Sequence, residues 1–217
     1  MDWSLIWTNR DLYVEGLWAT VRLSIAAIAT GTAVGLLVAA IRTSRIPVLA
    51  QAARAYLEVF RGTPLLIQML FIYFGAAYLG LAGISVFGAA LLALTLYQGA
   101  YIAEIFRAGI EAVPRGQWEA SRVLGMSGIQ TFKNVILPQT RVIVLPPLLG
   151  QHLSLIKDTS IAVIIGYVEL VRQGQAVIDR AGDPATSYFA VAVLYFLICY
   201  PLSLVVQRME RTAMVAR

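Results

Sequence analysis

The sequence predicts an all-α, polytopic membrane protein with five transmembrane helices, and three observations lead to this fold class. Hydrophobic residues make up 59% of the 217 positions and charged residues only 13%, whereas soluble domains have roughly 45–50% and about 25%. Several apolar stretches reach the length of about 20 residues that crosses a bilayer. The length left over is too short for a separate soluble catalytic domain. We therefore expect residues 1–217 to form a single transmembrane domain.

The apolar stretches place the spans. The uncharged stretch from Gly62 to Ala103 is too long for one pass, and its glycines between Gly75 and Gly88 predict a turn. The five spans are expected at about Leu17 to Ile41, Pro64 to Leu79, Val86 to Arg107, from near Val142 onward, and Ser187 to Val206. An odd number of spans puts the two termini on opposite sides of the membrane.

Two features accompany the first two spans. Gly31 and Gly35 form a GxxxG pair, which lets helix backbones approach closely, either within the chain or at a subunit contact. Pro47 opens a stretch in which Arg54 and Glu58 stand among apolar residues. This pattern is typical of an interfacial helix that leads into the next span, and a solvated loop is the alternative.

The distribution of arginine and lysine predicts the orientation. With the N-terminus outside, the outside segments carry only Arg10, Arg172 and Arg180. The inside segments carry Arg42, Arg45, Arg54, Arg61, Arg107, Arg115, Arg122, Lys133, Arg141, Arg208, Arg211 and Arg217. Basic loops are held in the cytoplasm, so we expect the N-terminus out and the C-terminus in. The formal charge of +5 therefore does not indicate a nucleic-acid partner, since no basic patch is interleaved with stacking aromatics.

A short charged insert at about residues 111–140 lies on the predicted cytoplasmic side. Gly116 is expected to be the N-cap of a helix of about eight residues, with Glu119 at its third position and Gly125 as its left-handed stop. A helix this short is marginal alone in water. Ser127 and Gln130 form a capping box for a second short helix that we expect to end before Pro138. The insert suits docking against another protein, and an ordinary interhelical loop is the alternative.

The insert resembles the EAA loop of the membrane subunits of ABC importers. The matching residues are Glu119, Ala120, Ser121 (alanine in the family pattern), Gly125, Ile136, Leu137 and Pro138. Further stretches resemble the polar amino acid permease branch: FRGTPLLIQ from Phe60, AYIAEIFRAGI from Ala100, GQWEA from Gly116, ILPQ from Ile136 and KDTS from Lys157. The resemblance covers nearly the whole chain and implies the type I ABC importer permease fold.

The resemblance also implies a function. In that family the EAA loop forms a coupling helix that sits in a cleft of a separate ATP-binding subunit. The chain would then be a permease subunit of the bacterial cytoplasmic membrane, not an enzyme, that imports a polar amino acid by alternating access. Its partners would be two ATP-binding subunits, a second permease subunit, an external solute-binding protein, the amino acid and membrane lipid. ATP and Mg would bind the partner ATPase, and this chain would bind no cofactor. The sequence has no phosphate-binding G-x-x-x-x-G-K-[ST] loop.

Three ionisable residues lie at apparent membrane depth: Glu104, Lys157 and Asp158. Each costs about 2.5–3.5 kcal/mol at a helix centre, so all three should face protein or water. Asp158, Thr159 and Ser160 are good N-cap residues and predict a fresh short helix from Ile161 towards Val171. One hypothesis places Glu104 in the translocation path, facing the substrate ammonium, and Lys157 to Ser160 near its carboxylate. The alternative is a buried polar network that fixes helix packing.

Two other classes of function are weaker alternatives. An intramembrane enzyme would need a catalytic set, and the sequence offers no Ser/His/Asp triad, no catalytic residue and no metal-ligand cluster, His152 standing alone. An ATP-independent channel would have no docking site for an ATPase. Binding of a cytoplasmic ATPase through Glu119 would separate both from the importer.

Overall fold

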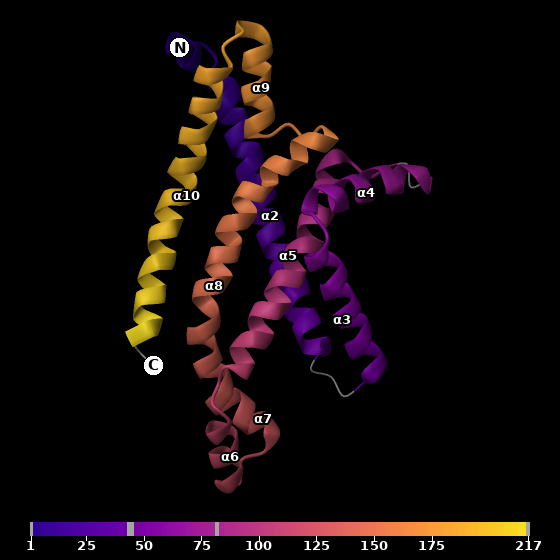
Figure 1. Ribbon diagram of the computed structural model, residues 1–217, viewed down its shortest axis with the longest axis vertical. Coiled ribbons are helices and arrows are strands. Elements are labelled where there is room, and N and C mark those ends of the chain that lie inside the picture. Colours follow the sequence, from indigo (N-terminus) through magenta and orange to yellow (C-terminus); the bar gives the residue numbers. More distant parts are fainter. Residues whose placement is uncertain (1, 43–45, 81–82, 216–217) are drawn as a thin grey trace.

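The computed structural model describes residues 2–42, 46–80 and 83–215, and helices dominate them, as the sequence predicts (Figure 1). The helices are α1 (Ser4–Thr8), α2 (Arg10–Arg42), α3 (Pro47–Gly62), α4 (Leu65–Tyr78), α5 (Val86–Glu111), α6 (Arg115–Val123), α7 (Gly128–Thr131), the π-helix η1 (Phe132–Ile136), α8 (Leu137–Asp158), the 3-10 helix η2 (Thr159–Ile165), α9 (Leu170–Ala181) and α10 (Pro184–Val215). Arg45 and Arg217, which were counted for the orientation, lie outside the described residues.

Four helical stretches are long and apolar enough to cross a membrane, and they match four of the predicted spans. They are Arg10–Arg42, Val86–Glu111, Gly128–Ile165 and Pro184–Arg211. The third of these begins well before Val142, because α7 and η1 of the insert run into α8. The two ends of the chain lie at opposite ends of the elongated bundle (Figure 1).

The remaining predicted span, from Pro64 to Leu79, coincides with α4, but α4 alone is too short to qualify as a span. Helix α4 has 14 residues, roughly 21 Å, and meets α3 at an angle of 109°. Pro64 forces the break because it lacks an N–H and favours extended backbone at Thr63, whose φ and ψ are −118° and 147°. Gln68 Nε2 donates to the carbonyls of Phe60 and Thr63, which the end of α3 leaves unpaired.

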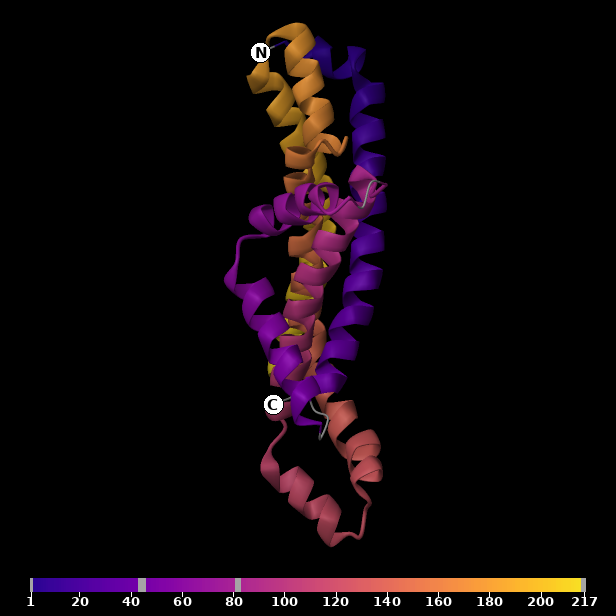
Figure 2. The ribbon, with the colours of Figure 1, turned by 90° about the vertical axis from the view of Figure 1, so that its right-hand side faces the viewer.

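Helix α3 confirms a helical stretch that begins at Pro47 and excludes the loop alternative. It packs against the side of the bundle through Leu57, which contacts Ala100 and Ala103 of α5 and Val38 of α2, while most residues of α3 are exposed. By length and composition α3 and α4 qualify as a span only when they are taken together, and α4 lies across the bundle (Figure 2).

Helices α2 and α5 form the tightly packed centre of the molecule, and the GxxxG pair belongs to this contact. A Cβ on Gly31 would lie 2.8 Å from the side chain of Gln98, and one on Gly35 would lie 2.6 Å from that of Ile102. Gly99 of α5 is packed in the same way against Val34. The pair therefore serves packing within the chain.

The chain does not start a new helix at Asp158, so the predicted cap is wrong. Helix α8 continues to Asp158 and narrows into η2, which ends at Gly166 in the left-handed conformation with φ of +86°. The hydroxyls of Thr159 and Ser160 donate back to the carbonyls of Ile156 and Lys157, both at 2.7 Å. Such back-bonding competes with capping, and the next helix begins only at Leu170.

Candidate functional site: the insert and two carboxylate clusters

The insert between α5 and α8 forms a separate lobe at the end of the bundle where the C-terminus lies (Figure 2). Helix α5 runs without interruption to Glu111, buried Val113 follows, and α6 begins at Arg115. The return through α7 and η1 leads directly into α8. Two membrane-spanning helices therefore begin or end at this lobe.

Helix α6 is nine residues long, close to the predicted length, but it starts earlier than expected. Pro114, with extended φ and ψ of −54° and 137°, is the N-cap, so Gly116 is not. Glu119 consequently lies at the fifth helical position instead of the third. The stop is confirmed: Gly125 has φ of +74°, a conformation that favours glycine.

The capping box of the second short helix is also confirmed. Ser127 Oγ accepts from the N–H of Gln130, and the Gln130 side chain accepts from the N–H of Ser127. Helix α7 ends at Thr131, before Pro138, but the helical backbone continues without a break. Because Pro138 has no N–H for the carbonyl one turn back, the chain widens into the π-helix η1 and continues as α8.

The predicted coupling residues divide into an exposed and a buried group. Glu119 and Ala120 of α6 are exposed, as are Gly116, Gly125 and Pro138. Ser121 and Ile136 are buried and Leu137 is half-buried, so these hold the lobe together. The position that departs from the family pattern, Ser121, thus takes a small side chain inside the lobe.

Three exposed apolar side chains of the lobe were missed by the sequence analysis. Val123, Leu124 and Ile129 are 88%, 78% and 81% exposed. We call Glu119, Ala120, Val123, Leu124 and Ile129 the lobe face. Apolar exposure on short helices that project from the bundle is typical of a surface that another protein covers.

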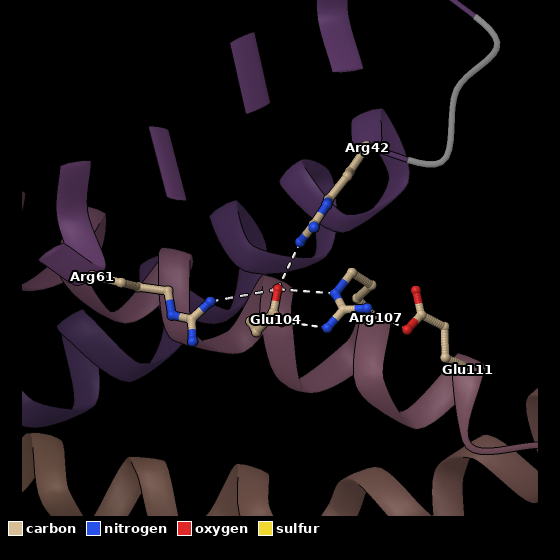
Figure 3. Close-up of polar contacts among 5 residues, drawn as sticks. All are labelled: Arg42, Arg61, Glu104, Arg107 and Glu111. Atoms are coloured by element: carbon tan, nitrogen blue, oxygen red, sulfur yellow. Dashed lines mark hydrogen bonds and ion pairs between the residues drawn. The ribbon is translucent and has the colours of Figure 1, made fainter. Parts of the chain in front are cut away.

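Glu104 lies in a cluster of arginines near the same end of the bundle (Figure 3). Its carboxylate accepts from Arg42 Nη1 at 2.6 Å and from Arg107 Nε at 3.0 Å, and Arg61 Nη1 lies 3.6 Å away. Arg107 also binds Glu111. The arginines come from α2, α3 and α5. Of the two alternatives for Glu104, these contacts support the packing network.

The other predicted pathway residues lie apart from Glu104, around the end of α8. Lys157 is exposed on this chain, Asp158 and Ser160 are half-buried, and Thr159 is fully buried. The chain provides no helix N-terminus here, because α8 passes into η2. Lys157 is thus the group in this stretch whose charge suits a carboxylate.

A second carboxylate cluster, around Glu169, was not predicted. Glu169 is fully buried at the end of the bundle opposite the lobe and is the N-cap of α9. It accepts from the hydroxyls of Thr20 and Tyr195 at 3.3 and 2.9 Å and from the N–H of Arg172 at 3.0 Å. Burial raises the pKa of this carboxyl, and the hydrogen bonds oppose the shift. The sequence signal was weak because glutamate is an uncommon N-cap.

Among the described residues, no group of three or more His, Cys, Asp and Glu side chains could hold a metal ion. His152, the single histidine, has its Nε2 3.2 Å from the Thr32 hydroxyl.

Residues 31–214 match the family model described as the inner membrane component of binding-protein-dependent transport systems. The chain is 40% identical to the glutamine transport system permease protein GlnP of Escherichia coli K12 over 97% of this chain and 96% of that protein. It is 36% identical to the probable glutamine ABC transporter permease protein GlnM of Bacillus subtilis, over 97% of each. A crystal structure of an amino acid ABC transporter with histidines superposes with a TM-score of 0.93 at 35% identity, covering 98% of this chain and 99% of that one. The chain belongs to the family of inner membrane components of binding-protein-dependent transport systems.

Proposed function

We propose that this chain is the permease subunit of an ATP-driven importer of polar amino acids. It would work with a second permease subunit, two ATP-binding subunits and an external solute-binding protein, and the N-terminus would lie outside. An amino acid as substrate is supported by the relatives, since GlnP and GlnM are named as glutamine permeases and the superposed structure is an amino acid ABC transporter. ATP and Mg would bind the partner subunits, and this chain would carry the path.

The observation that carries the proposal is the lobe. Its exposed face joins a charged residue, Glu119, to the apolar Val123, Leu124 and Ile129. A helix of nine residues has little stability of its own, so a cleft on an ATPase that holds it would also fix its position. Because η1 runs directly into α8 and only three residues separate α5 from α6, a displacement of the lobe would displace two membrane helices.

Charge reversal at Glu119 tests the coupling. In vesicles that contain the complete complex, Glu119→Lys should lower ATP-driven uptake by about tenfold or more, because like charge or an unpaired charge at an interface costs several kcal/mol. Uptake is measured with a panel of labelled amino acids, including glutamine, and ATP hydrolysis is measured in parallel. Glu210→Lys, the same reversal at an exposed site of α10 outside the lobe, is the matched control. Full uptake by the Glu119→Lys complex would argue strongly against this mechanism.

The substrate path is the second part of the proposal. Lys157 is exposed on the isolated chain although it lies at membrane depth. Contact with lipid would cost about 2.5–3.5 kcal/mol, so its charge should face a water-filled path or the second permease subunit. Asp158, Thr159 and Ser160 would line the same region.

Lys157→Met removes the charge and keeps most of the side-chain volume. If Lys157 meets the substrate carboxylate, the KM for uptake should rise by about tenfold, while ATP hydrolysis without substrate stays unchanged. Lys133→Met in η1 is the control. An unchanged KM with normal membrane insertion would remove Lys157 from the path and leave the role of the lobe unaffected.

A further inference from the structure

One carboxylate, Glu104, connects the ends of three helices. Arg42 is the last residue of α2, Arg61 is next to the last residue of α3, and Arg107 follows Glu104 by one turn of α5. Figure 3 shows the three guanidinium groups converging on this carboxylate from different directions. Arg61 is also held over the ring of Tyr101, with 5.7 Å from Cζ to the ring centroid.

The three helices around Glu104 also contact each other through uncharged side chains. Leu57 of α3, Ala100 and Ala103 of α5 and Val38 of α2 form a small apolar cluster. Tyr56 of α3 donates to the carbonyl of Leu96 of α5 at 2.5 Å. The three helices are therefore in contact along one level, and Glu104 joins them at the edge that lies towards the lobe.

Helix α5 links this junction directly to the lobe. From Glu104 to Glu111 it continues for about two turns, roughly 10 Å, as regular α-helix. Ala112 closes the helix through its N–H to the Ala108 carbonyl at 3.0 Å, and buried Val113 then leads into α6. An α-helix of two turns transmits displacement with little bending.

Both carboxylate oxygens of Glu104 are already occupied. Oε1 accepts from Arg107, and Oε2 accepts from Arg42 and Arg107 and faces Arg61. A substrate ammonium could bind here only after displacing a guanidinium group. The arrangement thus fits a structural junction better than a substrate contact.

We propose that Glu104 is a positioning residue that makes the inner ends of α2, α3 and α5 move as one body when the lobe is displaced. The inference rests on the proposed function and extends it from the lobe to the helices that it drives. Without the carboxylate, three like charges would repel each other at this junction. Helix α5 would still follow the lobe, but α2 and α3 would follow less closely.

The test compares Glu104→Gln with Glu111→Gln in vesicles that contain the complete complex. Glu111 is the matched control because its partner Arg107 lies on the same helix. For Glu104→Gln we expect the amount of amino acid imported per ATP hydrolysed to fall by about tenfold, with an unchanged KM for uptake. The Glu111 variant should stay near the wild-type ratio. The labelled amino acid is the one that wild-type vesicles import fastest.

A distance measurement gives an independent readout. Spin labels at Leu37→Cys and Ala108→Cys, both exposed sites on α2 and α5, are introduced together with Cys199→Ser. We expect one narrow distance distribution with Glu104 and a broader one with Glu104→Gln in the presence of ATP. A raised KM at unchanged import per ATP, or an unchanged ratio and distance distribution, would overturn the proposal.

Two further results complete the test. If the Glu104→Gln chain does not reach the membrane, the double variant with Glu104→Arg and Arg42→Glu is tested. Restored membrane insertion and a restored amount imported per ATP hydrolysed support the junction, and loss of both contradicts it. If wild-type vesicles import without ATP, the proposed function itself has failed, which is distinguishable because that result does not depend on Glu104.

Discussion

Glu104 and Glu169 are two carboxylates that each join three helices, yet they do so with opposite chemistry. Near the lobe, Glu104 binds charged arginines from α2, α3 and α5, and its side chain remains 22% exposed. At the other end, Glu169 binds only neutral donors and is fully buried, joining α2, α9 and α10. Helix α2 contributes to both, through Arg42 and Thr20.

The difference separates a junction that water can reach from one that it cannot. Water reaches the arginines around Glu104 and can solvate them when the carboxylate is lost, so the cost in stability is low. The donors around Glu169 have no water to replace the carboxylate, so losing it leaves buried polar groups unpaired. Close backbone contact adds to the rigidity there, since a Cβ on Gly16 would lie 2.8 Å from Leu170 Cα. We infer that the lobe end moves during transport while the Glu169 end keeps its shape.

Truncation of each carboxylate to alanine should reveal the largest difference in stability between the two junctions. Glu169→Ala should lower the free energy of unfolding by about 2–4 kcal/mol, because the Thr20 and Tyr195 hydroxyls lose their acceptor and a cavity forms. Glu104→Ala should cost only about 1 kcal/mol, since water can solvate the arginines. Thermal and denaturant unfolding in detergent measures both. Equal losses for the two variants would show that the Glu169 end is not the more rigid one.

Local features of the site were predictable from the sequence because their causes are local. Gly125 terminates α6, and Ser127 pairs with Gln130, because each motif is complete within a few residues. The same locality explains the errors at Gly116 and at Asp158 to Ser160. Residues that can cap a helix can also continue one, and the flanking backbone decides between the two.

Contacts between distant segments were not predictable. Arg42 and Glu104 are 62 positions apart, and Thr20 and Glu169 are 149 apart. Nothing in the pattern of either segment identifies the partner. The membrane-spanning helices themselves followed from hydropathy, except that α4 is too short to qualify without α3.

A smaller effect, which sharpens the comparison further, is expected from Glu169→Gln. The amide oxygen still accepts from Thr20 and Tyr195, so the change in unfolding free energy at low pH should stay below about 1 kcal/mol. The pKa of Glu169 is raised by burial from its ordinary value of 4.5. The folded protein therefore holds the proton more tightly than the unfolded chain, and wild-type stability should fall as the pH rises from about 4.5 through the raised pKa. The Gln variant lacks this loss, so thermal unfolding from pH 4 to pH 8 should show it gaining stability relative to wild type as the pH rises. Parallel pH profiles for the two proteins would mean that the buried hydrogen bonds fully compensate the charge.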